Sequence, residues 1–561
     1  MASSANAVRN QAGGGTPPRP TRIWAPGRRV TSRKETTYAA AAAITAILLA
    51  LSTAFPMLWI CGILAPLPVL ALAPEVSTPA AAQFAFLAYL FAGGAFWYAE
   101  GRLMPPAMLL AGQLVGAAVF ATAAAAAAEA TKRWSGILAS LTFPTIVTAF
   151  FFAAGGISPY GTWGDPAYLM AGFAPLTEVA AMLGADGITF IAWLVPSCLA
   201  VAWYRRQWHM NWLAPLIASG AIIGIAVIAG TIQLFSPLKA GGARIGMVAL
   251  DEQSEGAKPG NIPAAVDLVD RYAKLVREAA DQGAQAVVLP EKVVAVTPRY
   301  QLDVEQGFRD IASMSRVWLA AGFDHIDRKP MRNIVRLFAP DGRIFSYEEH
   351  HLKPNLELGY ERGHRVLIVD PPWGKTAVVV ASDLDFPDTV RELSAVGVKL
   401  VLAPAWGWPG NTAAIHREMV RVGGVEGGFA VASSGRGGVV LATDLHGRGI
   451  ATGTASGRAI GAVAVANLRL GNGATLYSRG WGDWFGRLII LLAIVILARF
   501  ALIVRRQILM RMQQGFRAPV VPHAAARQPA AQPEEAPKPE PKREAEPEVY
   551  HAMTRPPEDY E

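Results

Sequence analysis

Eight long apolar runs restrict what this chain can fold into. A helix needs about 20 largely apolar residues to cross a bilayer, and all eight approach that length, although the first two are short. The runs are Ala39–Phe55, Met57–Leu72, Ala81–Ala99, Met104–Ala128, Ile137–Ala154, Ile188–Tyr204, Trp212–Phe235 and Leu488–Val504. One such run could be a buried helix of a water-soluble domain. Eight of them, in a chain with only 17% charged residues, predict a bundle of membrane-spanning helices.

The positions of lysine and arginine predict how the bundle is oriented. Basic pairs at Arg33–Lys34, Lys132–Arg133, Arg205–Arg206 and Arg505–Arg506 all fall on one side if the runs cross in turn. Because cytoplasmic loops are enriched in these residues, we expect both termini in the cytoplasm. The segment between the seventh and eighth runs is then extracytoplasmic, as is 155–187. A multi-pass protein of a bacterial inner membrane, with a periplasmic domain, fits this pattern.

Charge and cysteine content exclude several classes of function. The net charge of +8 could indicate nucleic-acid binding, but the arginines lie beside the apolar runs rather than on one basic face, so we expect no nucleic-acid partner. Cys61 and Cys198 both lie in apolar runs, which predicts no disulfide framework and no cysteine-based metal cluster. The pair His350-His351 lacks a third ligand at metal spacing. We therefore expect neither a metal nor another cofactor.

Between the seventh and eighth runs the sequence changes character. β-Branched runs alternate with helical patterns, which is typical of an α/β domain. The predicted strands are Arg244–Leu250, Ala286–Leu289, Val317–Gly322, Ile334–Phe338, Thr376–Ala381, Leu400–Ala403, Ala430–Ser433 and Val439–Ala442. The predicted helices are Ala264–Gln282, Thr389–Val396 and Thr412–Glu426.

The chain is thus expected to have five parts. These are a basic cytoplasmic tail (1–36), a bundle of seven spans (37–236), the α/β domain (241–472), an eighth span (485–506) and a second cytoplasmic tail (514–561). The last part is rich in Pro, Glu and Lys and cannot bury a core, so we expect it to be disordered.

Three motifs in the α/β domain carry candidate chemistry. Glu291 follows a strand in Val287-Val288-Leu289-Pro290-Glu291, at a strand end where α/β active sites gather, and could act as a general base. Alone, it could equally be a solvated glutamate paired with Lys292. The second motif is Tyr347-Glu348-Glu349-His350-His351-Leu352-Lys353-Pro354, followed by Glu357. The third is a strand that ends in Ser382-Asp383-Leu384-Asp385-Phe386-Pro387.

In this order the motifs resemble those of the carbon-nitrogen hydrolase (nitrilase) superfamily. Together with the spans, over roughly residues 37–505, the chain is similar to the membrane branch of that superfamily, the apolipoprotein N-acyltransferases. The resemblance implies an α-helical membrane bundle of about eight helices that carries an extracytoplasmic α/β/β/α sandwich, so that 241–472 is a carbon-nitrogen hydrolase-like domain. It also implies acyl transfer from a membrane phospholipid to the amino terminus of a lipoprotein.

The resemblance further implies a Glu-Lys-Cys triad, in which the thiol attacks a carbonyl, the glutamate handles the proton and the lysine stabilises negative charge. Glu291 occupies the Glu position. The Lys position falls on Glu349 and the Cys position on Ala381, so two of the three groups are replaced.

Two neighbouring residues could supply what is missing. Lys353 follows Glu349 by four residues, roughly 13 Å along an extended chain, which is too far for its amine to fill the vacant position. Ser382 follows Ala381, and on a strand it would point to the opposite face, away from the pocket. A serine hydroxyl also does not ionise near neutral pH as readily as a cysteine thiol does. We keep both as candidate catalytic residues but expect neither to compensate.

Four other residues match the resemblance. Glu357 corresponds to an additional glutamate near the triad, and Asp383 to the acidic residue after the nucleophile; either could instead be a capping or salt-bridging carboxylate. Trp406 and Trp408 could line an acyl or lipid pocket, or could simply lie at a membrane rim, where tryptophan is common.

Three functions remain open. The first is a divergent acyltransferase or amidase that uses Glu291 with Ser382 or another nucleophile. The second is a pseudoenzyme that binds lipid or lipoprotein without turnover, which the loss of two catalytic groups favours. The third, transport by the bundle, is weak because the spans carry almost no ionisable residues.

Overall fold

The computed structural model describes residues 28–100, 104–236, 241–250, 262–326, 329–407, 412–436, 439–453, 461–471, 475–477 and 482–515. Most of the predicted N-terminal tail, almost all of the C-terminal tail, and Trp408 lie outside these residues. Residues up to Ile503 form one compact unit, and a second begins at Val504. The description below concerns the first unit.

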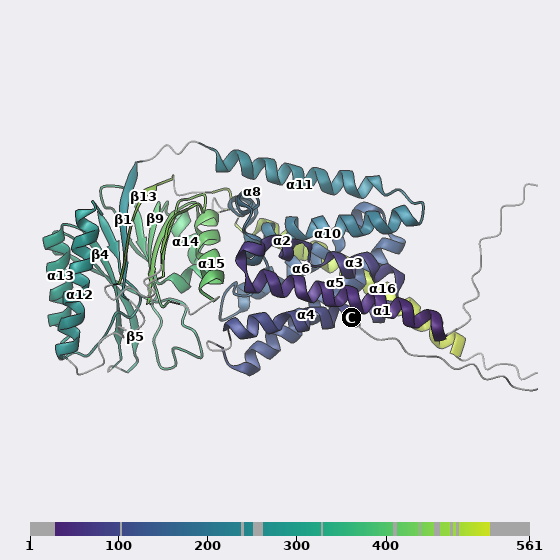
Figure 1. Cartoon of the computed structure of the whole chain (residues 1–561), viewed down its shortest axis with the longest axis horizontal. Coiled ribbons are helices and arrows are strands. Elements are labelled where there is room, and N and C mark those ends of the chain that lie inside the picture. Colours follow the sequence, from purple (N-terminus) through teal and green to yellow (C-terminus); the bar gives the residue numbers. More distant parts are fainter. Residues whose placement is uncertain are drawn as a thin grey trace, which may run out of the picture. The chain divides into compact units, whose positions relative to one another are not determined.

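Long apolar helices make up one half of this unit (Figure 1). Among the described residues, eight helical segments are long and apolar enough to cross a membrane, and each overlaps one of the predicted runs. The long helices are α1 (Arg28–Ala54), α4 (Thr78–Glu100), α5 (Pro106–Arg133), α6 (Gly136–Ile157), α10 (Ala185–Gln207), α11 (Leu213–Leu234) and α16 (Trp484–Gly515). The remaining segment, Pro56–Glu75, consists of α2 (Trp59–Leu64) and α3 (Leu67–Leu72) between 3-10 turns. Prolines interrupt it, because each lacks a backbone donor for a continuous helix.

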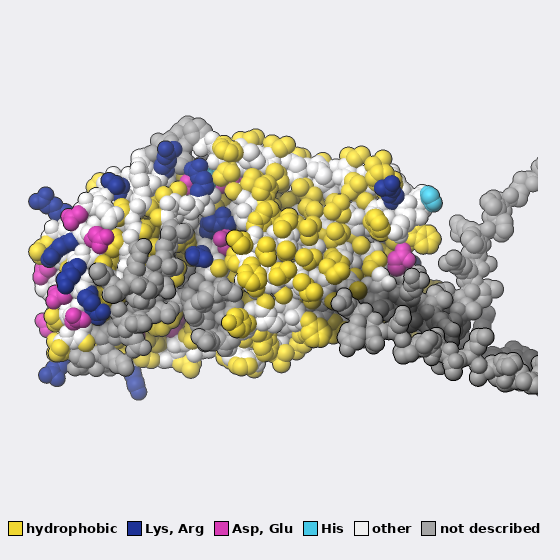
Figure 2. Space-filling model, viewed as in Figure 1, with side chains coloured by type: hydrophobic (Ala, Val, Ile, Leu, Met, Phe, Trp, Pro, Cys, Tyr) yellow, Lys and Arg dark blue, Asp and Glu magenta, His cyan; other side chains and the backbone are white. Residues whose placement is uncertain are grey.

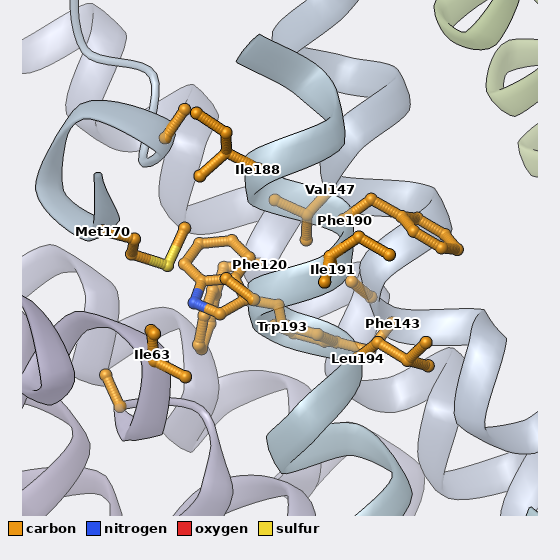
Figure 3. Packing of buried hydrophobic residues seen from close by; sticks show 14 of the residues in the cluster. Ile63, Phe120, Phe143, Val147, Met170, Ile188, Phe190, Ile191, Trp193 and Leu194 are labelled. Atoms are coloured by element: carbon orange, nitrogen blue, oxygen red, sulfur yellow. The ribbon is translucent and has the colours of Figure 1, made fainter. Parts of the chain in front are cut away.

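Helix α10 lies at the centre of the bundle and is the most buried of the candidate spans. Its Trp193 is surrounded by Phe120, Phe143 and Met170 (Figure 3), and its indole N–H donates to the carbonyl of Gly62 at 3.0 Å. That hydrogen bond satisfies the single polar atom of a large, fully buried side chain. The bundle is therefore packed like a protein core along its axis.

The segment between α6 and α10 was expected only as a loop. It contains three short helices, α7 (Ala167–Met170), α8 (Ala174–Thr177) and α9 (Ala180–Leu183). We refer to residues 158–184 as the junction segment, because it contacts the α/β domain as well as the bundle.

The second half is a sandwich of two sheets between two pairs of helices (Figure 1). The first sheet has the order β13-β1-β2-β4-β5-β6, with β3 paired to β4. Its strands are β1 (Gly242–Ala249), β2 (Ala286–Val288), β3 (Val294–Val296), β4 (Trp318–His325), β5 (Arg332–Phe338), β6 (Ile344–Glu348) and β13 (Ala462–Arg469). Helices α12 (Ile262–Asp281) and α13 (Gln301–Ser315) cover its outer face.

The second sheet has the order β12-β11-β10-β9-β8-β7. Its strands are β7 (Leu367–Val369), β8 (Thr376–Val378), β9 (Leu400–Ala405), β10 (Ala430–Gly435), β11 (Val440–Thr443) and β12 (Gly449–Gly453). Helices α14 (Pro387–Ala395) and α15 (Thr412–Gly427) cover its outer face. The central pairs β1–β2, β2–β4, β8–β9 and β9–β10 are parallel. Both faces of these strands are buried, which explains their unbroken apolar sequences.

The predicted fold class, a multi-helix bundle with an α/β/β/α domain, is confirmed. All eight predicted strands are present, while β3, β6, β7, β12, β13 and α13 were not predicted. One predicted strand end is wrong: Thr376–Ala381 was expected as strand, but β8 stops at Val378 and a 3-10 helix, η3, occupies Ala381–Asp385.

Helix α15 has apolar residues on two faces. Val420 belongs to the core between the sheets, whereas Ile415, Met419 and Val422 belong to the same buried cluster as the bundle helices. The face shown in Figure 2 has hydrophobic side chains over the bundle and charged ones toward the end that carries α12 and α13. The α/β domain is thus joined to the bundle through a shared core.

Candidate functional site

Glu291 emerges from the end of β2 in a tightly fixed backbone. Its amide donates to the carbonyl of Ala405 in the second sheet, at 3.0 Å. A Cβ at Gly322 would lie 2.6 Å from the Glu291 Cα and 2.4 Å from the Lys292 nitrogen, so only glycine fits beside this turn. The next residue, Lys292, takes a left-handed backbone conformation with φ of 50°. The carboxylate of Glu291 is therefore held, buried, at the strand end.

Three glutamates that lie far apart in the sequence meet at this point. Glu291, Glu349 after β6, and Glu357 in the following loop each present a carboxylate oxygen within 4.8 Å of the others, and all three are buried. Asn333 on β5 joins them: its amide nitrogen donates to Glu349 at 2.6 Å and to Glu291 at 2.9 Å. We call Glu291, Glu349 and Glu357 the glutamate cluster.

Two lysines supply positive charge to the glutamate cluster. Lys292 lies 2.7 Å from Glu357 and 3.7 Å from Glu291. Lys353 lies 3.9 Å from Glu349. Three carboxylates so close together could hold a divalent cation by geometry alone, but two ammonium groups already contact them. This set of groups fits a buried ion-pair network better than a metal site.

The expectation that Lys353 cannot reach the vacant position is wrong. The estimate assumed an extended chain, whereas the chain after Glu349 turns back. The Lys353 amide donates to Glu357 at 2.9 Å, which brings the start of the side chain close to the cluster. The lysine itself is buried. A lysine that enters from this loop therefore lies beside Glu349.

The expectation that Ser382 points away from the pocket is also wrong. Strand alternation does not apply because the residue lies in η3 rather than in β8. Its hydroxyl donates to Glu349 Oε1 at 2.9 Å. A serine hydroxyl therefore contacts a carboxylate directly beside Ala381, where the resemblance expects the thiol.

A cavity opens beside these residues. Its lining includes Ala381, Ser382, Asp385, His416 and Arg417, and its volume is small, about 40 Å³.

The junction segment forms part of the cavity surroundings. The ring of Trp163 lies 5.0 Å from that of His416, and the Thr162 amide donates to the Asp385 carbonyl at 2.9 Å. Bundle and domain thus both border the site.

Burial and charge set the protonation of the glutamate cluster. Burial, together with repulsion from Glu357, raises the pKa of Glu349 well above its usual value. Burial also raises the pKa of Glu291, although Lys292 partly offsets this. For Glu357 burial acts in the same direction, but Lys292 above all overcomes it and lowers the pKa to about 2. Glu349 is therefore the carboxyl of the cluster that most readily holds a proton.

Asp383 fixes the loop that carries Glu349. It accepts hydrogen bonds from the Tyr347 hydroxyl at 2.6 Å and from the His351 amide at 2.8 Å. The His351 ring also contacts Asp383 and stacks on Phe386 at 3.8 Å. These contacts give both His351 and Asp383 a positioning role.

Of the two predicted tryptophans, the structure describes Trp406, which is not among the residues that line the cavity. Trp406 is partly exposed, and its ring lies 5.2 Å from the Lys292 ammonium and 4.7 Å from the Arg436 guanidinium. Its role in binding an acyl chain stays a prediction, and Trp408 lies outside the described residues.

Sequence reasoning missed four residues of the site. Lys292 was considered only as a surface partner, Asp385 was quoted in the third motif without a role of its own, and Asn333 and His416 were given no role. Asn333 is a polar residue in the otherwise largely apolar strand β5. A polar residue at a buried position is unusual, and it could have marked Asn333 as a candidate site residue. The sequence could not place Asp385 and His416 at the same cavity, because only the fold brings them together.

Residues 260–462 match the family described as carbon-nitrogen hydrolase. The chain contains a carbon-nitrogen hydrolase domain. Among curated relatives, an apolipoprotein N-acyltransferase from Gloeobacter violaceus is 26% identical over 349 residues, which is 58% of this chain and 64% of the relative. A nitrilase from Pyrococcus abyssi is 28% identical over 146 residues, 24% of this chain and 56% of the relative. The matches therefore span less than two thirds of these relatives.

Solved structures are also similar to part of this chain. An amidase from Nesterenkonia sp. is 19% identical, covers 42% of this chain and 93% of its own, and has a TM-score of 0.34. In this chain the region matched to the carbon-nitrogen hydrolase family occurs together with apolar helices that are long enough to span a membrane.

Proposed function

We propose that the protein is a membrane-embedded acyltransferase of the carbon-nitrogen hydrolase type, in which Ser382 replaces the usual thiol. The observation that carries this proposal is the hydrogen bond from Ser382 to Glu349 at 2.9 Å. A serine is a weak nucleophile unless a neighbouring base removes its proton. Glu349 can do so in its ionised form, and its raised pKa makes that form a stronger base. The replacement of the Lys position by Glu349 is then part of the mechanism.

In the first step the Ser382 oxygen attacks the carbonyl carbon of an acyl ester. Its proton moves to Glu349, a C–O bond to serine forms, and the bond to the leaving alcohol breaks. Glu349 passes the proton to the departing oxygen. An amine or water then attacks the acyl-serine and releases the product, so that the enzyme is regenerated with all protons accounted for.

Lys353 supports the charge that develops during this step. The Lys353 ammonium lies 3.9 Å from a Glu349 carboxylate oxygen, so it pairs with Glu349 when that group is anionic. Once Glu349 takes the serine proton, that carboxyl no longer neutralises the ammonium. The positive charge then acts on the oxyanion of the tetrahedral intermediate, which is the role that a buried cation serves best.

The junction segment supports a lipid as the acyl donor. Trp163 and Thr162 connect the apolar bundle to the lining of the cavity, through His416 and Asp385. These contacts place the cavity lining next to the junction segment, and we propose that the acyl donor approaches from this side. We propose a membrane phospholipid as donor and an amino-terminal lipoprotein amine as acceptor, in line with the related N-acyltransferase. The corresponding location is a bacterial inner membrane, with the domain periplasmic and the termini cytoplasmic.

The test is acyl transfer by the purified, detergent-solubilised protein from labelled phosphatidylethanolamine to a diacylglyceryl peptide. Ser382→Ala should reduce turnover by roughly a thousandfold or more, because it removes the nucleophile. Ser346→Ala, at an exposed position of β6, is the matched control and should retain it. A serine-linked acyl group, detected by mass spectrometry of the wild type, should be absent from Ser382→Ala.

Other outcomes would change the assignment. Turnover that survives in Ser382→Ala would exclude Ser382 as the nucleophile. Absence of turnover in the wild type, together with saturable phospholipid binding, would show that the protein binds lipid without catalysing acyl transfer. The observation that favours this second candidate is the glutamate cluster, whose charges are largely compensated within the fold by Lys292 and Lys353.

A further inference from the structure

A second carboxyl group accompanies Ser382 in the cavity. Ser382 and Asp385 both lie in the 3-10 helix η3 and are three residues apart. In a 3-10 helix with three residues per turn, side chains at this spacing lie on the same side. Both residues accordingly line the cavity. The turn that presents the serine therefore also presents a carboxyl group.

Asp385 has an oxygen that no described residue satisfies. Its side chain is buried, with only 4% of its surface exposed. Within the described part of the chain, Oδ1 accepts no hydrogen bond. Oδ2 lies 3.9 Å from His416 Nδ1, beyond ordinary hydrogen-bond distance. A buried carboxyl oxygen without a donor is costly, so its presence on a cavity wall indicates a ligand that brings an N–H or O–H group.

The surroundings favour a nitrogen donor that is cationic or becomes so. Burial lowers the pKa of His416 to about 3, so the imidazole is neutral and does not neutralise Asp385. Burial raises the pKa of Asp385 itself to about 7, with Lys353 acting in the opposite direction and Asp383 adding to the rise. A carboxyl that titrates near neutral pH can exchange a proton with a substrate under working conditions.

We propose that Asp385 receives the primary amine of the acyl acceptor and takes its proton during the second half of the reaction. This inference rests on the proposed function of Ser382. The amine nitrogen attacks the acyl carbon, a C–N bond forms and the C–Oγ bond to Ser382 breaks. The amine proton moves to Asp385 and then to the departing serine oxygen. The assignment explains why the carboxyl lies on the side of the turn that carries the nucleophile.

The backbone of Asp385 is held so that it can perform this role. The Thr162 amide and hydroxyl both donate to its carbonyl, each at 2.9 Å. The neighbouring Gly161 approaches so closely that a Cβ would lie 2.3 Å from the same oxygen. The junction segment of the bundle thus positions the acceptor carboxyl of the domain.

The experiment compares Asp385→Asn with Asp341→Asn, the same chemical change at an exposed turn. Binding is measured in the full-length, detergent-solubilised protein with a fluorescent peptide that has a free amino terminus and with its N-acetylated counterpart. The wild type and Asp341→Asn should bind the free amine at least tenfold more tightly than the acetylated peptide. Asp385→Asn should lose this preference while its affinity for the acetylated peptide is unchanged.

A kinetic measurement separates this inference from the proposed function. Release of lysophospholipid in the first turnover reports acylation of Ser382, and formation of the amide reports the second step. Asp385→Asn should retain the first release within about threefold and lose amide formation by at least tenfold.

The two ideas can fail independently. A wild type without the first release refutes acyl-serine chemistry, and the binding comparison then still decides the amine site. Equal binding of the free and acetylated peptides by the wild type would overturn the role of Asp385, as would an unchanged preference in Asp385→Asn. The wild-type comparison needs no variant, so it holds even if Asp385→Asn fails to fold.

Discussion

Glu349→Gln is expected to abolish acyl transfer and, at alkaline pH, to stabilise the protein. Carboxylate oxygens of Glu291 and Glu357 lie within 4.8 Å of Glu349. With an effective dielectric constant of about 20, each such pair of negative charges repels by about 3 kcal/mol. The ammonium of Lys353, 3.9 Å from Glu349, attracts the ionised Glu349 by about 4 kcal/mol. The repulsions thus exceed the attraction by about 2 kcal/mol, and burial adds to the cost.

The sign of the pH dependence follows from the pKa of Glu349. Burial and the neighbouring carboxylates raise that pKa above the ordinary value of 4.5. The folded state therefore favours the protonated form, and this stabilisation is complete below the pKa of the unfolded chain. It is lost as the pH rises through the raised pKa of the folded chain. Glutamine cannot ionise, so the advantage of the variant should grow over this pH range to about 2 kcal/mol.

The assay pairs thermal unfolding in detergent, followed by tryptophan fluorescence between pH 5 and 9, with acyl transfer at the same pH values. Turnover of Glu349→Gln should fall by roughly 10² to 10⁴, because the amide cannot accept the proton of Ser382. Glu392→Gln, at an exposed position of α14, controls for the loss of one charge. Full turnover in Glu349→Gln, or lower stability than the wild type at every pH, would refute the reasoning.

Three further predictions concern residues around the site. Lys353→Met should destabilise the protein by about 3 kcal/mol or more, measured by thermal unfolding, because it leaves buried carboxylates without their cation. Gly161→Ala should lower stability by about 1 to 3 kcal/mol and reduce turnover, because φ of +59° and the contact with Asp385 both disfavour a Cβ; an unchanged melting temperature would contradict this. Burial lowers the pKa of His351, but hydrogen bonds to Asp383 and Asp388 raise it to about 9. The stabilisation relative to His351→Gln should therefore be largest below pH 6.5 and should disappear as the pH rises through 9, which unfolding measured at several pH values will test.

The fold could be predicted to the extent that it depends on local pattern. Apolar runs of sufficient length predicted the helices of the bundle, and the buried central strands, such as β2 and β9, appeared as short apolar runs. Strand β13 was missed because its alternation is built largely from alanine, and its pairing with β1 joins segments more than 200 residues apart. That pairing leaves no local mark in the sequence.

The candidate site could be predicted from the sequence less completely than the fold. Glu291 could be predicted from its place after a strand, but Ser382 and Lys353 were assigned the wrong directions. Both assignments assumed extended chain, where the structure has a 3-10 turn and a loop that folds back. Long-range contacts accompany these departures, including the hydrogen bond from Thr162 to Asp385. Local spacing cannot indicate where such contacts form.

The two apolar faces of α15 bear on how this protein can be studied. A truncation that keeps only the carbon-nitrogen hydrolase domain would leave Ile415, Met419 and Val422 facing water, since the bundle that covers them would be gone. An apolar stripe of this kind on a free surface promotes association. The truncation would also remove Thr162 and Gly161, which contact the backbone carbonyl of Asp385 in the intact chain. For preparative purposes the carbon-nitrogen hydrolase domain is therefore inseparable from the helices, and studies of the site require the intact chain in detergent or lipid.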